Sequence, residues 1–199
     1  MPVKTSNVSH ARFSDHASSA WSLLTSFLWG FAEGTVFFIV PDVYLGFVAL
    51  FNWRRGLWAM VAAVLGAMVG GSVMYGLAMK DLSALNLLLT RIPLINREMI
   101  ADIAHQMQAD GLLTMVNGPF RGVPYKIYAV QAGGQSLPYL PFLFMTILAR
   151  LERLLPVTLL AGGMGKWFKD FVERHTTLVV AGYILIWGII YFLYYLRFR

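Results

Sequence analysis

Apolar residues dominate four long stretches of this chain, and polar residues gather between them. The apolar stretches are residues 21–50, 56–79, 111–149 and 176–196. The second and fourth contain no Asp, Glu, Lys or Arg. Each of these two is long enough for the roughly 20 residues that an α-helix needs to cross the hydrocarbon core of a bilayer. The pattern therefore predicts an all-α integral membrane protein, with transmembrane helices over 56–79 and 176–196.

The first stretch is interrupted in its middle by Glu33, Pro41 and Asp42. Proline removes a backbone donor and clashes with the preceding helical turn. Backbone groups freed at membrane depth are tolerated only where protein or a water cavity surrounds them. We therefore expect a re-entrant hairpin over 21–50, which enters the membrane and returns to the same face.

The third stretch contains a similar interruption. It is broken by two prolines and a glycine, with two basic residues among them: Pro119, Gly122, Pro124, Arg121 and Lys126. We expect a second re-entrant hairpin over 111–134, followed by a helix over 138–165. A hairpin and a helix thus follow each other twice. This order predicts two halves in an inverted repeat, a design of many secondary transporters.

Two more polar segments complete the order of elements. Residues 1–20 are polar and lack the short apolar core of a secretory signal, so we expect them to stay on the mature protein. Residues 80–110 separate the two halves and place Met99, Ile103 and Met107 on one side of a helix. This pattern predicts an amphipathic segment that lies at the membrane interface.

Composition agrees with the membrane class and excludes several kinds of site. Hydrophobic residues make up 58% of the 199 residues and charged residues 13%, whereas soluble domains have about 25% charged residues. The chain has no cysteine, which excludes disulfides, thiol catalysis, iron–sulfur clusters and thiolate zinc sites. The four histidines lack metal-binding spacing, so we expect no metal and no cofactor. The net charge of +6 then indicates contact with anionic lipid head groups and not with nucleic acid.

Two patterns concern packing and anchoring. Gly66 and Gly70, with Gly71 one position on, give the helix over 56–79 a face of small residues, which lets another helix approach closely. The aromatic residues between Tyr191 and Tyr195 are typical of side chains that anchor a helix at the membrane interface.

The two predicted hairpins carry charges of opposite sign. Glu33 and Asp42 lie in the first, and Arg121 and Lys126 lie in the second. A lone charge at the bilayer centre costs about 2.5–3.5 kcal/mol, so such residues are expected to pair or to face a wet cavity. We therefore expect these four side chains to meet. A further charged group lies within the helix over 138–165: Arg150, Glu152 and Arg153.

The second hairpin resembles a known family signature. Its sequence NGPFRGVPYKIYAVQAGG, residues 117–134, is similar to the DedA superfamily, also called the VTT or SNARE-associated domain, and most similar to its YqaA-like branch. In that branch a Pro-Tyr-Lys triplet, here residues 124–126, precedes an apolar stretch that ends in glycine. An Arg-x-x-Arg follows, here Arg150 and Arg153.

The first half resembles the same family, so that the resemblance covers about residues 25–170, within the predicted membrane domain over residues 21–170. Glu33 and the pair of Pro41 and Asp42 precede a glycine-rich helix, as in the family. Two features depart from it. Only eight residues separate Glu33 from Asp42, and Lys126 stands where the family usually has a second arginine.

The resemblance implies a role in membrane homeostasis in the bacterial inner membrane. It implies a proton-dependent transporter or flippase of an anionic lipid, either a phospholipid or a polyprenyl phosphate. On this hypothesis Arg121 and Lys126 hold the phosphate group, and Glu33 and Asp42 gate it. Arg150 and Arg153 belong to the same candidate site. The expected partners are membrane lipids and protons. Whether the protein forms a homo-oligomer is left undecided by the sequence.

Three other readings bear on function. The first is a structural or assembly membrane protein. Its charged residues would only form ion pairs or extend to head groups. An ion or small-solute carrier would use the same charged hairpins. We expect no enzyme, because the chain has no nucleophile elbow, no phosphate-binding glycine loop before a lysine and no HExxH motif.

Overall fold

The computed structural model describes residues 4–198, and this part of the chain is all-helical, without a strand. The expected all-α class is therefore confirmed. Residues 1–3 of the polar N-terminal segment lie outside the described residues. The elements are α1 Lys4–Ser18, α2 Ala20–Thr35, α3 Asp42–Phe51, α4 Trp53–Lys80, α5 Leu82–Leu89, α6 Arg97–Asp110, η1 Gly111–Leu113, α7 Thr114–Arg121, α8 Tyr125–Gly134, α9 Tyr139–Trp167, α10 Lys169–Arg174 and α11 Thr176–Phe198.

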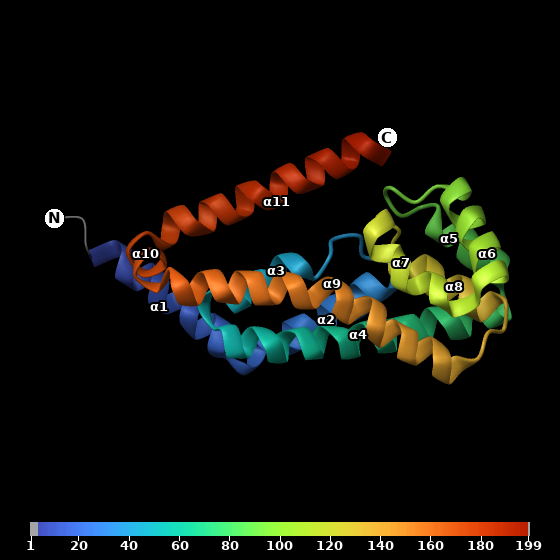
Figure 1. The fold of residues 1–199 in the computed structure, drawn as a ribbon, viewed down its shortest axis with the longest axis horizontal. Coiled ribbons are helices and arrows are strands. Elements are labelled where there is room, and N and C mark those ends of the chain that lie inside the picture. The colour runs from blue at the N-terminus through green and yellow to red at the C-terminus, as the bar shows by residue number, and fades with distance from the viewer. Residues whose placement is uncertain (1–3, 199) are drawn as a thin grey trace.

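Within residues 4–198, two helices are long and apolar enough to cross a membrane. They are α4, over Trp53–Lys80, and the part of α11 over Thr176–Leu196. Both were expected from the sequence, where they are the stretches without charged residues. Helix α9 is as long as α4 and runs antiparallel to it along the length of the molecule (Figure 1).

Each half of the chain has the same order of elements. In the first half, α2 and α3 are separated by the non-helical residues 36–41 and are followed by the long helix α4. In the second half, α7 and α8 are separated by residues 122–124 and are followed by the long helix α9. We call residues 36–41 the first break and residues 122–124 the second break. The two predicted hairpin segments therefore each contain two α-helices and one break, and the second also begins with η1.

Helices α2 and α4 pack closely because glycines lie at their contact. Gly66 and Gly70 of α4 lie against the backbone carbonyl groups of Phe27 and Phe31 on α2, where a Cβ atom would collide. Such close approach of two backbones is the role expected of small residues on a membrane helix. Gly71 lies against a tyrosine side chain of α8 instead. The small-residue face of α4 thus contacts an element from each half.

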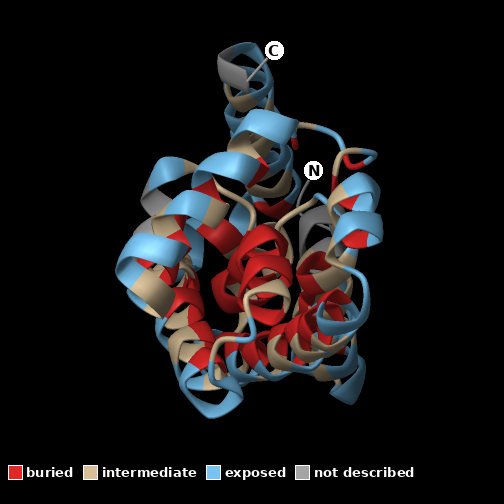
Figure 2. Cartoon of the chain, turned by 90° about the vertical axis from the view of Figure 1, so that its right-hand side faces the viewer, coloured by how far each residue is buried: buried red, intermediate tan, exposed pale blue. Residues whose placement is uncertain are grey.

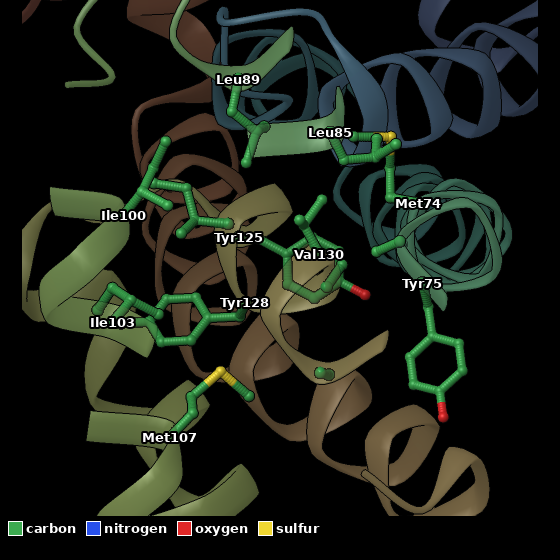
Figure 3. Close-up of a cluster of buried hydrophobic side chains, with 14 of the residues drawn as sticks. Met74, Tyr75, Leu85, Leu89, Ile100, Ile103, Met107, Tyr125, Tyr128 and Val130 are labelled. Atoms are coloured by element: carbon green, nitrogen blue, oxygen red, sulfur yellow. The ribbon is translucent and has the colours of Figure 1, made fainter. Parts of the chain in front are cut away.

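The segment between the halves contains two helices, α5 and α6, which pack around α8 (Figure 3). Ile100, Ile103 and Met107 of α6 are buried in the same core as Tyr128 of α8. The amphipathic pattern of this segment was recognised in the sequence. Its apolar side, however, packs against protein, because α8 lies within reach of both helices.

Buried residues gather at the centre of the helix bundle, and exposed ones cover its outside (Figure 2). On α4, the residues at every fourth position are apolar and at least 40% exposed, and they form one stripe: Val61, Leu65, Val69, Val73 and Leu77. Soluble monomers rarely expose a contiguous apolar surface of this kind. The stripe lies on the outside of a helix that is long enough to cross a bilayer, which favours contact with lipid.

Candidate functional site

The first break places two acidic residues at its two ends. Glu33 lies in the last turn of α2, which ends where the Thr35 hydroxyl donates to the carbonyl of Phe31 (3.1 Å). Pro41 precedes α3, so that Asp42 occupies the first turn of that helix. A carboxylate is favoured there because the N-terminal end of a helix carries partial positive charge.

The second break places a lysine in an equivalent position. Helix α7 ends before Gly122, which has a positive φ of 74° that a residue with a Cβ rarely adopts. Pro124 then precedes α8, so that Lys126 lies in the first turn of that helix. Pro119, which was expected to break the chain, lies within α7, and its side chain is outside the described part of the structure.

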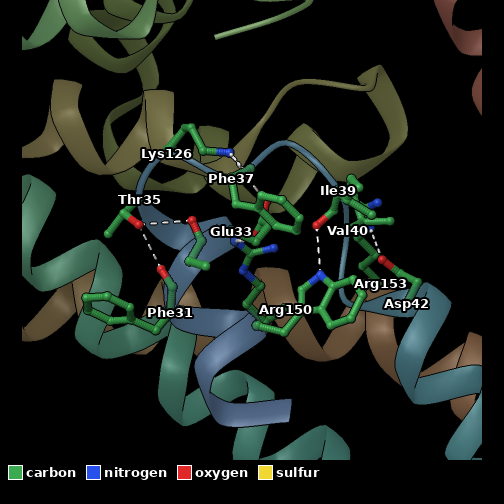
Figure 4. A network of polar contacts seen from close by, with 12 residues as sticks. Phe31, Glu33, Thr35, Phe37, Ile39, Val40, Asp42, Lys126, Arg150 and Arg153 are labelled. Carbon is green, nitrogen blue, oxygen red and sulfur yellow. Dashed lines mark hydrogen bonds and ion pairs between the residues drawn. The ribbon is translucent and has the colours of Figure 1, made fainter. Parts of the chain in front are cut away.

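Glu33 is the centre of a network of ion pairs that joins both halves (Figure 4). Its carboxylate accepts a hydrogen bond from the guanidinium of Arg150 on α9. Its other oxygen lies 3.9 Å from Nζ of Lys126. The same Nζ donates to the carbonyl of Phe37 in the first break (3.0 Å). All three charged side chains are at most 3% exposed, so the protein supplies the counter-charges that water would otherwise screen.

Asp42 forms a second ion pair with the same helix. Its Oδ2 lies 3.2 Å from Nε of Arg153, although the geometry is not that of a hydrogen bond. Asp42 is buried, whereas the Arg153 side chain is 30% exposed. Arg150 and Arg153 are three residues apart and share one face of α9, as expected from their spacing. Helix α9 thus contacts both acidic residues beside the first break, Glu33 and Asp42.

We call these five residues the charged cluster: Glu33, Asp42, Lys126, Arg150 and Arg153. The cluster holds three cations and two carboxylates, which leaves a formal charge of +1. Its cations are not all equally held, because Arg150 is also stacked over the ring of Tyr125, 4.2 Å from the ring centroid. Arg153 is the most exposed of the five. An anion that reached the cluster would meet Arg153 most directly.

A cavity of about 260 Å³ opens onto the cluster. Its charged lining consists of Glu33, Lys126 and Arg153. Its remaining lining is largely apolar and comes from four places: both breaks, the connection between α5 and α6, and α11. Small-molecule pockets usually have about 300–1,000 Å³, so this cavity is slightly smaller than a typical ligand pocket and too small for a whole lipid.

The structure corrects the expectation for Arg121. Its side chain is exposed, and its Nη1 donates to Oε1 of Gln106 on α6 (2.7 Å). It therefore does not meet Glu33 or Asp42. The physical reason is its place at the end of α7, on the side that faces α6, before the turn at Gly122 redirects the chain. Lys126 and the two arginines of α9 provide the cations instead.

Sequence reasoning also missed the side chains that hold the breaks. Nε1 of Trp29 donates to the carbonyl of Ile39 in the first break (3.0 Å). Tyr191 and Tyr194 of α11, which were expected to anchor this helix at the membrane interface, bond to the backbone of the two breaks. A signal was present in the sequence, because the α11 aromatic residues recur at intervals of three or four residues, which is the period of one helix face.

Comparison with known proteins gives a partial relative. A Histophilus somni protein described as "uncharacterized protein HI0703 homolog" is 30% identical to this chain over 81 residues, which is 41% of this chain and 42% of that protein. The match thus spans less than half the length of the relative. No family model matches the chain. No solved structure matches it either.

Proposed function

We propose that this protein binds the head group of an anionic lipid in the cavity between the two breaks and moves that lipid across the membrane. The observation that carries the proposal is the lining of the cavity. Part of this lining is charged and belongs to a cluster of formal charge +1, and the rest is largely apolar. An amphiphile needs both kinds of surface. The helices α4 and α11, each able to cross a bilayer, support a membrane location.

The head group would contact Arg153 and Lys126, the two cations that line the cavity. A guanidinium binds phosphate oxygens in pairs, and an ammonium acts as a point charge. Both cations already contact a carboxylate, at 3.2 Å for Arg153 and 3.9 Å for Lys126. The head group therefore competes with Glu33 and Asp42 for the same partners.

This competition supports coupling to protons. When either carboxylate takes up a proton, its attraction for the neighbouring cation is lost, and that cation becomes more available to a phosphate. Proton binding and lipid binding then favour the same state of the cluster, which is the condition for one to drive the other. Glu33 is the stronger candidate for this role, because it contacts two of the three cations.

We also propose that the two breaks are the tips of re-entrant hairpins and that the halves form an inverted repeat. The equal order of elements and the antiparallel course of α4 and α9 support this arrangement (Figure 1). The positions of Glu33, Asp42 and Lys126 beside the breaks, with Arg150 and Arg153 next to them, support membership of the DedA superfamily. A place in the bacterial inner membrane follows from that proposal.

The test is translocation by the purified protein in proteoliposomes. Fluorescent phospholipid and a polyprenyl phosphate are measured separately, with and without an imposed pH gradient. We expect Arg153→Ala to slow movement at least tenfold and the matched variant Arg54→Ala, an exposed arginine at the start of α4, to move lipid like the wild type. Gradient-independent movement would indicate a scramblase. Movement of neither lipid by the wild type would overturn the proposal in favour of a carrier of ions or small solutes.

A structural role is the second candidate, favoured by the ion pairs that tie α2 and α3 to α9. Such a protein would need its charges only to hold these helices together. The exchange of Asp42 and Arg153 separates the two roles, because the variant Asp42→Arg with Arg153→Asp keeps a pair of opposite charges. A purely structural role predicts wild-type stability and activity. The transport role predicts a folded protein that moves lipid much more slowly, since Arg153, one of the two cations that line the cavity, has been replaced by a carboxylate.

A further inference from the structure

One face of α11 consists of aromatic side chains that point at the rest of the molecule. Tyr183, Trp187, Tyr191 and Tyr194 follow one another at intervals of four, four and three residues, which places them on one side of a helix. The last three line the cavity. The same helix is otherwise covered with exposed aliphatic residues, which suit lipid.

The tyrosines of this face bond to the backbone at or beside both breaks. The hydroxyl of Tyr191 accepts from the backbone N–H of Val40 (2.9 Å). The hydroxyl of Tyr194 donates to the carbonyl of Gly122 (2.8 Å). Breaks in a helix leave backbone groups without their usual partners, and at membrane depth such groups need others. These two hydroxyls supply partners for one group in each break.

A third bond joins α11 to α3, from the Tyr183 hydroxyl to the carbonyl of Val43 (2.8 Å), nearer the N-terminal end of α11. Only 6% of its most apolar stretch is buried. The elements whose backbones lie closest to it are α1 and α10, which are close to its N-terminal end. Figure 1 shows α11 diverging from α9 towards its C-terminal end, and Figure 2 shows that end of the helix exposed. The contacts near the cavity are therefore made mainly by long aromatic side chains.

We propose that α11 is a gate on the lipid side of the cavity, held closed by Tyr191 and Tyr194. When these hydroxyls leave the breaks, α11 swings about its attachment to α10, and an amphiphile reaches the charged cluster from the side, directly from the membrane. The identity of the amphiphile rests on the proposed function above, but the movement of α11 does not.

The movement is tested by labelling a cysteine inside the cavity. The chain has no cysteine, so a single Ile95→Cys, which replaces a cavity residue that is 6% exposed, is the only thiol. A membrane-permeable maleimide then reports opening. A hydrogen bond contributes ~1 kcal/mol, a factor of about five. We therefore expect labelling to accelerate about fivefold in Tyr191→Phe or Tyr194→Phe and roughly 25-fold when both hydroxyls are removed.

The matched control is Tyr139→Phe, which also removes one hydrogen bond of a tyrosine hydroxyl. The hydroxyl of Tyr139 donates to Oγ of Ser72 on α4 (2.9 Å), away from α11. It should label at the wild-type rate. Equal rates in all variants, with each eluting as a folded species in size exclusion, would overturn the gate. A second measurement places spin labels at Leu193→Cys on α11 and Leu87→Cys on α5, both exposed. The gate predicts a longer distance in the double phenylalanine variant, and an unchanged distribution contradicts it.

These measurements remain decisive if lipid translocation is not observed. Labelling and spin distance report the position of α11 in detergent or in vesicles without any substrate. Loss of transport with normal gate opening would therefore reject the proposed function alone. Normal transport with no gate opening would reject the gate alone.

Discussion

At the scale of single residues, Glu33 is the side chain on which the charged cluster depends most. It is the only member that contacts cations from two elements, α8 and α9. Buried ion pairs contribute little net stability, because desolvation offsets the attraction, but removal of one partner leaves the other charge buried without compensation. The cluster is therefore more sensitive to the loss of a charge than to the loss of side-chain volume.

The first prediction follows for Glu33→Gln. The substitution keeps the shape of the side chain but removes the counter-charge of Arg150 and Lys126, so it should destabilise the protein by about 3–5 kcal/mol. Thermal unfolding of the purified protein measures this effect. The control is Glu173→Gln, which breaks the exposed pair with Lys169 (3.7 Å) and should change stability by at most ~0.5 kcal/mol. Equal effects of the two substitutions would show that the buried network is not required for the fold.

At the scale of elements, the contact between α2 and α4 depends on glycines beside which there is no space for a methyl group. Gly66 lies against the carbonyl of Phe27, whereas Gly76, further along the same helix, has no atom close to the position of a Cβ. The two glycines thus lie on the same helix, but one is packed against backbone atoms and the other faces open space. Backbone atoms cannot move aside as a flexible side chain can, so the helices themselves must separate to admit a methyl group at Gly66.

We predict that Gly66→Ala lowers stability by about 1–3 kcal/mol, the usual range for overpacking a close contact. The matched variant Gly76→Ala should be neutral or stabilise by up to ~1 kcal/mol, because alanine favours the helix. Thermal unfolding of both variants under the same conditions is the measurement. A stable Gly66→Ala variant would mean that α2 and α4 are not packed as closely as described.

The elements that the sequence predicted well are those set by local properties. Apolar runs and prolines define the long helices and the break at Pro41, since hydrophobicity and proline sterics act over a few residues. The pairing of charges is different, because it depends on how distant elements meet. Arg121 was expected in the cluster, but the positive φ of Gly122 redirects the chain after it, and Arg150, 29 residues further along, pairs with Glu33 instead. No local pattern distinguishes these two arginines.

At the scale of the whole molecule, the long axis separates two ends that are built from short helices. Helices α1 and α10 lie at one end, and α5 and α6 lie at the other (Figure 1). Helices α4, α9 and α11 run between the two ends, and α4 and α11 are long and apolar enough to cross a membrane. On the proposed membrane arrangement all three cross, which would put the described N-terminal and C-terminal regions on opposite faces.

This arrangement predicts the sidedness of labelling. Asp15→Cys on α1 and Asp102→Cys on α6 replace exposed residues near opposite ends. An impermeant thiol reagent added outside intact cells should label one of them, and the other should react only after the membrane is permeabilised. Single-cysteine variants are sufficient, because the chain has no cysteine of its own. Labelling of both from outside would exclude a single crossing by α4 between these two positions.

The exposed stripe of α4 also fixes the depth of the cluster. Exposed apolar side chains on this helix run from Trp58 to Met79, about 32 Å at a rise of ~1.5 Å per residue, which equals the thickness of a bilayer's hydrocarbon core. Gly71 contacts Tyr125, and the guanidinium of Arg150 is stacked over the ring of that tyrosine. Along the helix axis, Gly71 lies ~4 Å from the midpoint of that span. On the proposed membrane location the charges would therefore lie near the midplane. A head group bound there would be almost equally far from both leaflets, so distance would favour neither direction of release.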